Sequence, residues 1–216
     1  MALFVITLLV GSLLVPLTTQ VEQRQIGETQ KTLEDIKEAL IGYALNKGFL
    51  PCPDTDNDGI VNPQNESGNC TSSEGNLPWA TLGIGQSDVW GNRLHYRVDP
   101  NFAQNTPIKL DSPADLQVCT SATCATRLTS STAGNGAAVV ILSHGKNGRG
   151  AINSQTGVAN PAPSSADELE NTNGNTTFVS RTPSTADAAV GEFDDIVSWL
   201  SKYLVFNRMV SAGKLP

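Results

Sequence analysis

One short segment has the residue types and spacing that bind a divalent cation. In residues 54–59 (DTDNDG), three carboxylates occupy alternate positions and a glycine follows them. Carboxylate and carbonyl oxygens around a sharp glycine turn are ligands that Ca²⁺ prefers. The pattern departs from a helix-flanked calcium loop at its twelfth position, where Asn65 stands instead of a bidentate glutamate. Two interpretations therefore stay open, a solvated acidic turn and a structural Ca²⁺ site with the side chains of Asp54, Asp56, Asp58 and Asn62 and the backbone carbonyl of Ile60 as ligands.

The four cysteines form two pairs that are close in sequence. Cys52 and Cys70 flank the acidic segment, and Cys119 and Cys124 are separated by four residues. Four cysteines allow three connectivities, of which local pairing, Cys52–Cys70 and Cys119–Cys124, is the simplest. A zinc site would need CxxC-type spacing and partner histidines, which the sequence does not offer. We therefore predict two structural disulfides and an oxidising compartment.

The sequence offers little to a catalytic interpretation. Its two histidines are His95, in an expected strand, and His144, directly after an apolar run. Ser143 and His144 are adjacent, so their side chains do not face each other, and no Gly-x-Ser-x-Gly elbow occurs. We expect both histidines to be structural and the protein not to be an enzyme.

The N-terminus predicts a membrane anchor. Residues 1–21 carry no charged side chain, and the first 17 are almost wholly apolar. A helix of that length spans roughly 25 Å, against about 30 Å for a bilayer core, so residues 18–21 or residues upstream must also contribute. A cleaved signal peptide and a buried core helix are the alternatives. No basic residue precedes the apolar run and no small-x-small cleavage site follows it, so we favour the retained anchor.

After the anchor, the apolar pattern changes to that of an amphipathic helix. Apolar residues recur along one helical face, and Gly48 marks the end of the helix. These face residues are Ile26, Leu33, Ile36, Leu40 and Ala44. Three domains are expected: an anchor at 1–21, an amphipathic helix at 22–48 and a periplasmic globular head at 49–216.

The head is expected to be rich in loops and to contain a few short strands. Strand patterns occur at 94–98 and, as a buried central strand, at 137–142. Residues 193–200 fit either a strand or a helix, and 202–212 fit a helix. The segments 53–76 and 145–190 are expected to be long loops. The predicted fold class is α+β, with one long helix packed on a small antiparallel sheet.

A net charge of −7 disfavours nucleic acid and anionic lipid surfaces as partners of the head.

Several short motifs, in their order along the chain, resemble the type IV pilin and type II secretion pseudopilin superfamily. Pro16 lies near the end of the apolar half-helix, and Tyr96 follows a DVWGN segment. The other motifs are ALIGYA at 39–44, LPCPD at 50–54, LPW at 77–79, DVWGN at 88–92 and FDDIVSW at 193–199. The family's processing signal, a glycine followed by phenylalanine and a glutamate, is not found before Met1, and we expect the true start to lie upstream.

The resemblance implies a non-enzymatic structural subunit of a pilus or secretion pseudopilus. Such a subunit is held in the inner membrane by one helix and exposes its head to the periplasm. Its expected partners are other pilin or pseudopilin subunits and the inner-membrane assembly machinery. The alternative from another class is a membrane-tethered, calcium-dependent binding or adhesin module that acts as a monomer. A secreted hydrolase is a third and weaker alternative, because no catalytic constellation is present.

Overall fold

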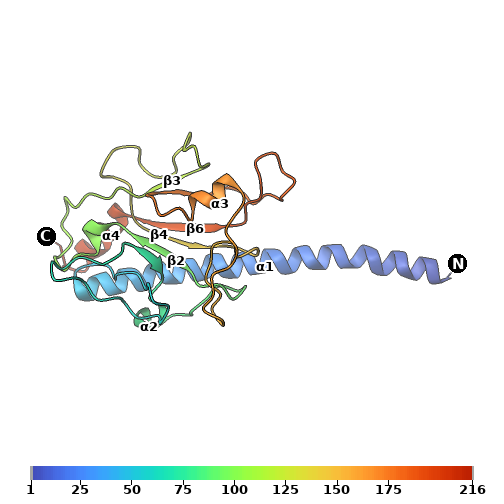
Figure 1. The fold of residues 1–216 in the computed structure, drawn as a ribbon, viewed down its shortest axis with the longest axis horizontal. Coiled ribbons are helices and arrows are strands. Elements are labelled where there is room, and N and C mark those ends of the chain that lie inside the picture. The colour runs from blue at the N-terminus through green and yellow to red at the C-terminus, as the bar shows by residue number, and fades with distance from the viewer. Residues whose placement is uncertain (1, 216) are drawn as a thin grey trace.

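A single long helix, α1 (Ala2–Lys47), organises the molecule. The computed structural model describes the backbone of residues 2–215 and the side chains of residues 19–215. Figure 1 shows α1 leaving the head and carrying the N-terminus far from it. Most of the anchor predicted for residues 1–21 lies outside the side chains that the structure describes. Among the described residues, no helix has both the length and the apolar character needed to cross a bilayer.

The C-terminal part of α1 packs on the head through the predicted apolar face. Leu33, Ile36, Leu40 and Ala44 are almost completely buried, and each lies three or four residues from the next. This spacing puts them on one side of a 3.6-residue helix. The helix ends at Lys47, because Gly48 adopts a positive φ of 86° and its N–H closes back on the carbonyl of Ala44 at 2.8 Å. The predicted amphipathic helix and its end are therefore confirmed, whereas Ile26, the first residue of the predicted face, is only partly buried and lies outside this core.

The helix lies on a four-stranded antiparallel sheet with the strand order β1-β2-β4-β6. The strands are β1 (Glu74–Asn76), β2 (His95–Val98), β4 (Ala137–Ser143) and β6 (Ile196–Ser201). The central strand β4 is buried on both faces. Val139 and Ile141 join the α1 core, whereas Val140 and Leu142 join a second cluster on the opposite face. The strands predicted at 94–98 and 137–142 are confirmed, and the ambiguous segment at 193–200 ends as a strand.

The face of the sheet away from α1 is covered by a second, smaller layer. There β3 (Gln117–Cys119) and β5 (Thr177–Val179) form a parallel pair, with α3 (Ala166–Glu170) beside them (Figure 1). Phe178 from β5 and Val118 from β3 pack with Val140 and Leu142 in the second cluster. The predicted loops 53–76 and 145–190 therefore contain short elements, namely β1, α3 and β5, that their polar composition did not indicate.

The C-terminal helix α4 (Lys202–Ser211) completes the layer that contains α1. It begins directly after β6, and the Ser201 hydroxyl caps it by accepting the N–H of Leu204 at 3.3 Å. Val205, Phe206 and Met209 enter the core formed with α1. The remaining short helices are α2 (Trp79–Leu82) and the 3₁₀ turn η1 (Pro100–Phe102). The fold is thus α+β in three layers. The layer of helices and the antiparallel sheet were predicted, whereas the layer of β3, β5 and α3 was not.

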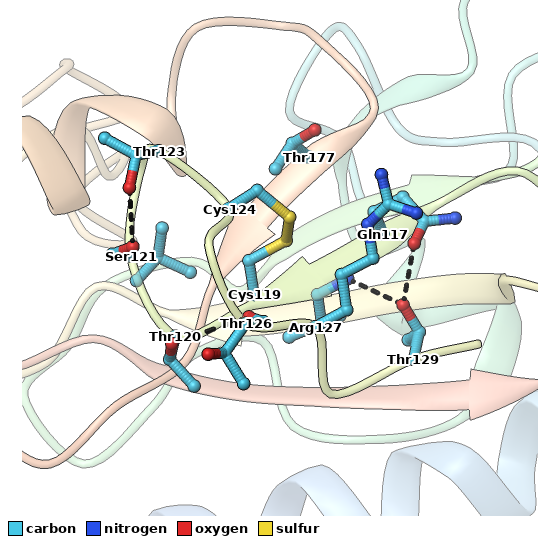
Figure 2. Close-up of a disulfide and its surroundings, with 12 residues drawn as sticks. Gln117, Cys119, Thr120, Ser121, Thr123, Cys124, Thr126, Arg127, Thr129 and Thr177 are labelled. Carbon is cyan, nitrogen blue, oxygen red and sulfur yellow. Dashed lines mark hydrogen bonds between the residues drawn. A yellow bond between two sulfur atoms is a disulfide. The ribbon is translucent and has the colours of Figure 1, made fainter. Parts of the chain in front are cut away.

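Both predicted disulfides are present. Cys52–Cys70 closes the segment between α1 and β1, and Cys119–Cys124 closes a small loop at the end of β3. Figure 2 shows this second bridge beside the polar contacts that fold the loop back on β3. There the Thr129 hydroxyl accepts the N–H of Val118 at 3.1 Å and donates to the side-chain oxygen of Gln117 at 3.1 Å. Local pairing of all four cysteines is therefore confirmed.

Candidate metal centre

The predicted acidic segment folds into a turn that is organised around Asp54. The Asp54 carboxylate is fully buried and accepts three backbone N–H groups. The donors are Asp56 at 3.2 Å, Asn57 at 2.7 Å and Gly59 at 2.8 Å. Burial raises the pKa of Asp54, and these backbone donors oppose the rise. Asp54 thus already acts as the internal cap of its own turn.

The turn is fixed against the rest of the head at both of its ends. The backbone of Asp54 pairs with Asn76 of β1 through two hydrogen bonds, of 2.9 and 2.8 Å. At the other end, Gly59 has a φ of 80°, and a Cβ there would lie 2.3 Å from Cε2 of Trp79. Only glycine permits this approach to the indole. The segment is therefore an ordered part of the head.

The structure brings together three of the five predicted ligands. Asp54, Asp56 and Asp58 each offer a carboxylate oxygen within 4.8 Å of the others, so this cluster could hold a metal ion. Asp56 and Asp58 are exposed, however, and the predicted carbonyl ligand of Ile60 is not among the grouped oxygens. The Asn62 amide oxygen accepts both the N–H and the hydroxyl of Thr55, at 2.5 and 2.9 Å. Asn62 is thus engaged within the loop.

A second acidic cluster, which the sequence did not indicate, involves the layer that covers the face of the sheet away from α1. It comprises Glu168 of α3 together with Asp194 and Asp195, which directly precede β6. One carboxylate oxygen of each residue lies within 4.8 Å of the others. Glu168 and Asp195 are buried and Asp194 is partly buried. Burial and mutual proximity make this cluster electrostatically different from the exposed acidic turn.

Each carboxylate of this second cluster is satisfied on one oxygen only. Asn147 donates its backbone N–H to Asp194 at 2.8 Å and its amide to Glu168 at 3.0 Å. The Asn171 amide donates to Asp195 at 2.7 Å. Among the residues that the structure describes, Oε2 of Glu168, Oδ1 of Asp194 and Oδ1 of Asp195 are buried without a hydrogen-bond partner. One oxygen of each of the three carboxylates therefore lacks a hydrogen-bond donor.

The electrostatic effect of this arrangement is largest at Asp194. Burial, together with the negative charges of Asp195 and Glu168, raises the pKa of Asp194 from 3.8 to about 7, against the opposing hydrogen bond from Asn147. Burial likewise raises the pKa of Glu168, and the charge of Asp195 adds to the rise. With a pKa of about 7, Asp194 binds a proton in part of the molecules at neutral pH, and a bound cation would displace that proton.

Two further residues shape the second cluster. Gly145 has a φ of 58°, and a Cβ there would lie 2.3 Å from the carbonyl oxygen of Asp194 and 2.5 Å from its Oδ1. His144 is 1% exposed, and its Nδ1 lies 3.6 Å from Oδ1 of Asp195. Neither ring nitrogen of His144 has a hydrogen-bond partner among the described residues. The other histidine, His95, places Nε2 at 3.0 Å from a carboxylate oxygen of Glu74.

One local signal in the sequence could have located Glu168. Ser165 and Glu168 have the S-x-x-E spacing of a helix start, and the Ser165 hydroxyl does accept the N–H of Glu168 at 3.3 Å. This capping pattern predicts α3 inside a segment whose composition otherwise indicates a loop. The meeting of α3 with Asp194 and Asp195 depends on tertiary packing, which no local pattern reports.

The two acidic clusters can therefore do different chemistry. The turn around Asp54 is satisfied by its own backbone, whereas the cluster of Glu168, Asp194 and Asp195 presents hard, unpartnered oxygens suited to a divalent cation. Comparison of the chain with protein-family models, with curated proteins and with solved structures finds no match. The chemistry of both sites is accordingly inferred from their own residues.

Proposed function

We propose that this protein is a pilin-like structural subunit of a type IV pilus or a type II secretion pseudopilus. The observation that carries the proposal is the arrangement of α1 (Figure 1), one continuous helix that packs on an antiparallel sheet through its C-terminal part and projects beyond the head at its N-terminal part. A helix that extends beyond the head can pack against equivalent helices in a filament. Two disulfides support a head that faces an oxidising compartment.

The proposed mechanism is assembly through the projecting helix. The apolar segment 1–21 would hold the subunit in the inner membrane and later bury itself against equivalent helices in the filament. At the described end of this segment and just after it, Val21 is 56% exposed and Gln23 and Arg24 are also exposed, while Glu22 between them pairs with Lys146 of the head at 3.2 Å, so only one side of this stretch of α1 is left free. This stretch can therefore contact a second copy without unfolding the head.

Photo-crosslinking in cells tests the proposal. A photoreactive amino acid at Gln23, an exposed position where α1 leaves the head, should yield adducts that contain a second copy of the chain. The matched control places it at Leu128, which is also exposed but lies on the loop after β3. The proposal requires adducts at Gln23 and none at Leu128. A subunit that stays monomeric at both positions would favour the alternative, a membrane-tethered calcium-dependent adhesin.

We also propose that the head binds a structural Ca²⁺, with the carboxylates of Glu168, Asp194 and Asp195 as ligands. Their three unpartnered oxygens support this choice over the turn of Asp54, whose carboxylate is already satisfied by its own backbone. A bound cation would neutralise the mutual repulsion of these carboxylates and tie α3 to the start of β6.

A further inference from the structure

A cavity of about 340 Å³ lies between the edge of the sheet and the segment that follows β4. Its walls come from the acidic turn, from β1, from the start of β2, from His144 and from residues 150–152. The polar side chains that matter to its chemistry are Asp54, Asn57, Glu74, Asn76, Arg93 and His144. A volume in this range is typical of sites for small molecules.

The defining residue of this cavity is Arg93. Its side chain lines the cavity and the residue is only 7% exposed. Within the described part of the chain, Nε and Nη1 of Arg93 are buried without a hydrogen-bond partner, and its guanidinium forms no ion pair. Burying an unpaired charge is costly, so such an arginine is normally matched by a carboxylate or another anion.

The acidic residues in the cavity wall do not supply that anion, because both are already engaged. Glu74 receives Nη1 of Arg97 at 2.7 Å on one oxygen, and its other oxygen faces Nε2 of His95 at 3.0 Å. Asp54 is surrounded by the three backbone N–H groups of its own turn. The positive charge of Arg93 is therefore left unmatched in a cavity whose two carboxylates are in use.

The remaining polar atoms of the wall suit a hydroxylated ligand. The Asn76 amide nitrogen donates to the Asn57 amide oxygen at 2.5 Å. That pairing leaves the nitrogen of Asn57 and the oxygen of Asn76 available as one donor and one acceptor.

From these observations we propose that the cavity binds a small hydroxylated carboxylate of the sugar-acid class. The carboxylate pairs with the Arg93 guanidinium, whose planar fork matches two carboxylate oxygens. The hydroxyl groups meet the amides of Asn57 and Asn76. This binding role is separate from filament assembly, since it uses the head alone and none of the projecting part of α1.

Calorimetric titration of the full-length chain in detergent tests the proposal with three probes. D-glucuronate carries the required carboxylate, D-glucose is its neutral counterpart, and inorganic phosphate is an oxyanion of different shape. Charge-assisted hydrogen bonds predict that glucuronate binds about 10- to 100-fold more tightly than glucose. Equal affinity for glucuronate and glucose, or no binding of either at millimolar concentration, overturns the proposal. Tighter binding of phosphate than of glucuronate overturns the carboxylate assignment.

Two variants locate the binding at Arg93. Arg93→Gln should lose the preference for glucuronate, and Arg93→Lys should retain only part of it because the fork is absent. The matched control is Arg149→Gln, which removes the same charge from an arginine near Glu192 outside the cavity wall and should bind like the wild type. Should the Arg93 variants not fold, glucuronate added to the ¹⁵N-arginine-labelled wild type must shift the Arg93 Nε–H resonance. An unshifted resonance refutes the site.

Discussion

Calcium should stabilise the head through the cluster of Glu168, Asp194 and Asp195. These residues present three unpartnered buried oxygens, so a bound cation replaces repulsion with attraction only in the folded state. Extracellular calcium modules bind with dissociation constants of about 10⁻⁴ to 10⁻³ M. At the tighter end, 1 mM Ca²⁺ stabilises the folded state by about 1.4 kcal/mol. For a chain of this length, the corresponding rise in melting temperature is about 3 to 6 °C.

Thermal unfolding in millimolar Ca²⁺ and in chelator measures this rise. Glu168→Gln and Asp195→Asn should abolish it, whereas Asp56→Asn, a matched change in the acidic turn, should leave it intact. The chelator arm separates ligand loss from misfolding. Removing one negative charge from a repulsive cluster should leave the calcium-free melting temperature unchanged or higher. Equal melting temperatures of the wild type in both conditions, or loss of the rise in Asp56→Asn, would refute the reasoning.

Three other predictions concern the stability of the head. Folding raises the pKa of Asp194 from 3.8 to about 7, so between these pH values the folded state binds a proton that the unfolded state has lost. Without calcium, the free energy of unfolding should therefore fall as pH rises from about 4 to 7. Urea titrations should show this fall, and Asp194→Asn should flatten it. Replacing both cysteines of the Cys52–Cys70 bridge by alanine should lower the free energy of unfolding by about 3 kcal/mol, since the bridge closes a separation of 18 residues. The same change at Cys119–Cys124, with a separation of 5, should lower it by about 2 kcal/mol. A reversed order in urea unfolding would contradict the loop-entropy argument. Gly42→Ala should stabilise α1 by about 1 kcal/mol, because a Cβ there meets nothing within 4 Å in the subunit, and an unchanged urea midpoint would count against it.

The parts of the fold that the sequence predicted are those set by local periodicity. The face of Leu33, Ile36 and Leu40, the helix stop at Gly48 and the apolar run of β4 each depend on neighbouring residues of one element. The disulfides were predictable for the same reason, since their partners are close in the chain. Short elements such as β3 and β5 carry only three residues each, too few to establish a period.

The candidate site could be predicted only in part, because residue type does not reveal whether a carboxylate is already satisfied. The spacing of Asp54, Asp56 and Asp58 did indicate carboxylates that meet, but not that Asp54 would cap its own turn. Conversely, Glu168 and Asp194 are 26 residues apart and meet only when α3 packs near the start of β6. The unmatched charge of Arg93 has the same origin, since its pairing depends on which side chains the tertiary fold places around it.

The way α1 joins the head also determines how the subunit carries mechanical load. A pull on the projecting end of α1 enters the head along the helix axis, with β6 beside the helix (Figure 1). Sliding the helix out would displace Leu33, Ile36, Leu40 and Ala44 from their pockets together, in shear. The contacts cannot be peeled away one at a time from an exposed edge. Near the far end of the helix, Arg208 of α4 pairs with Glu38 at 2.7 Å and adds a lateral link across the same interface. Tension therefore spreads over the whole packed length of α1 before any one contact yields.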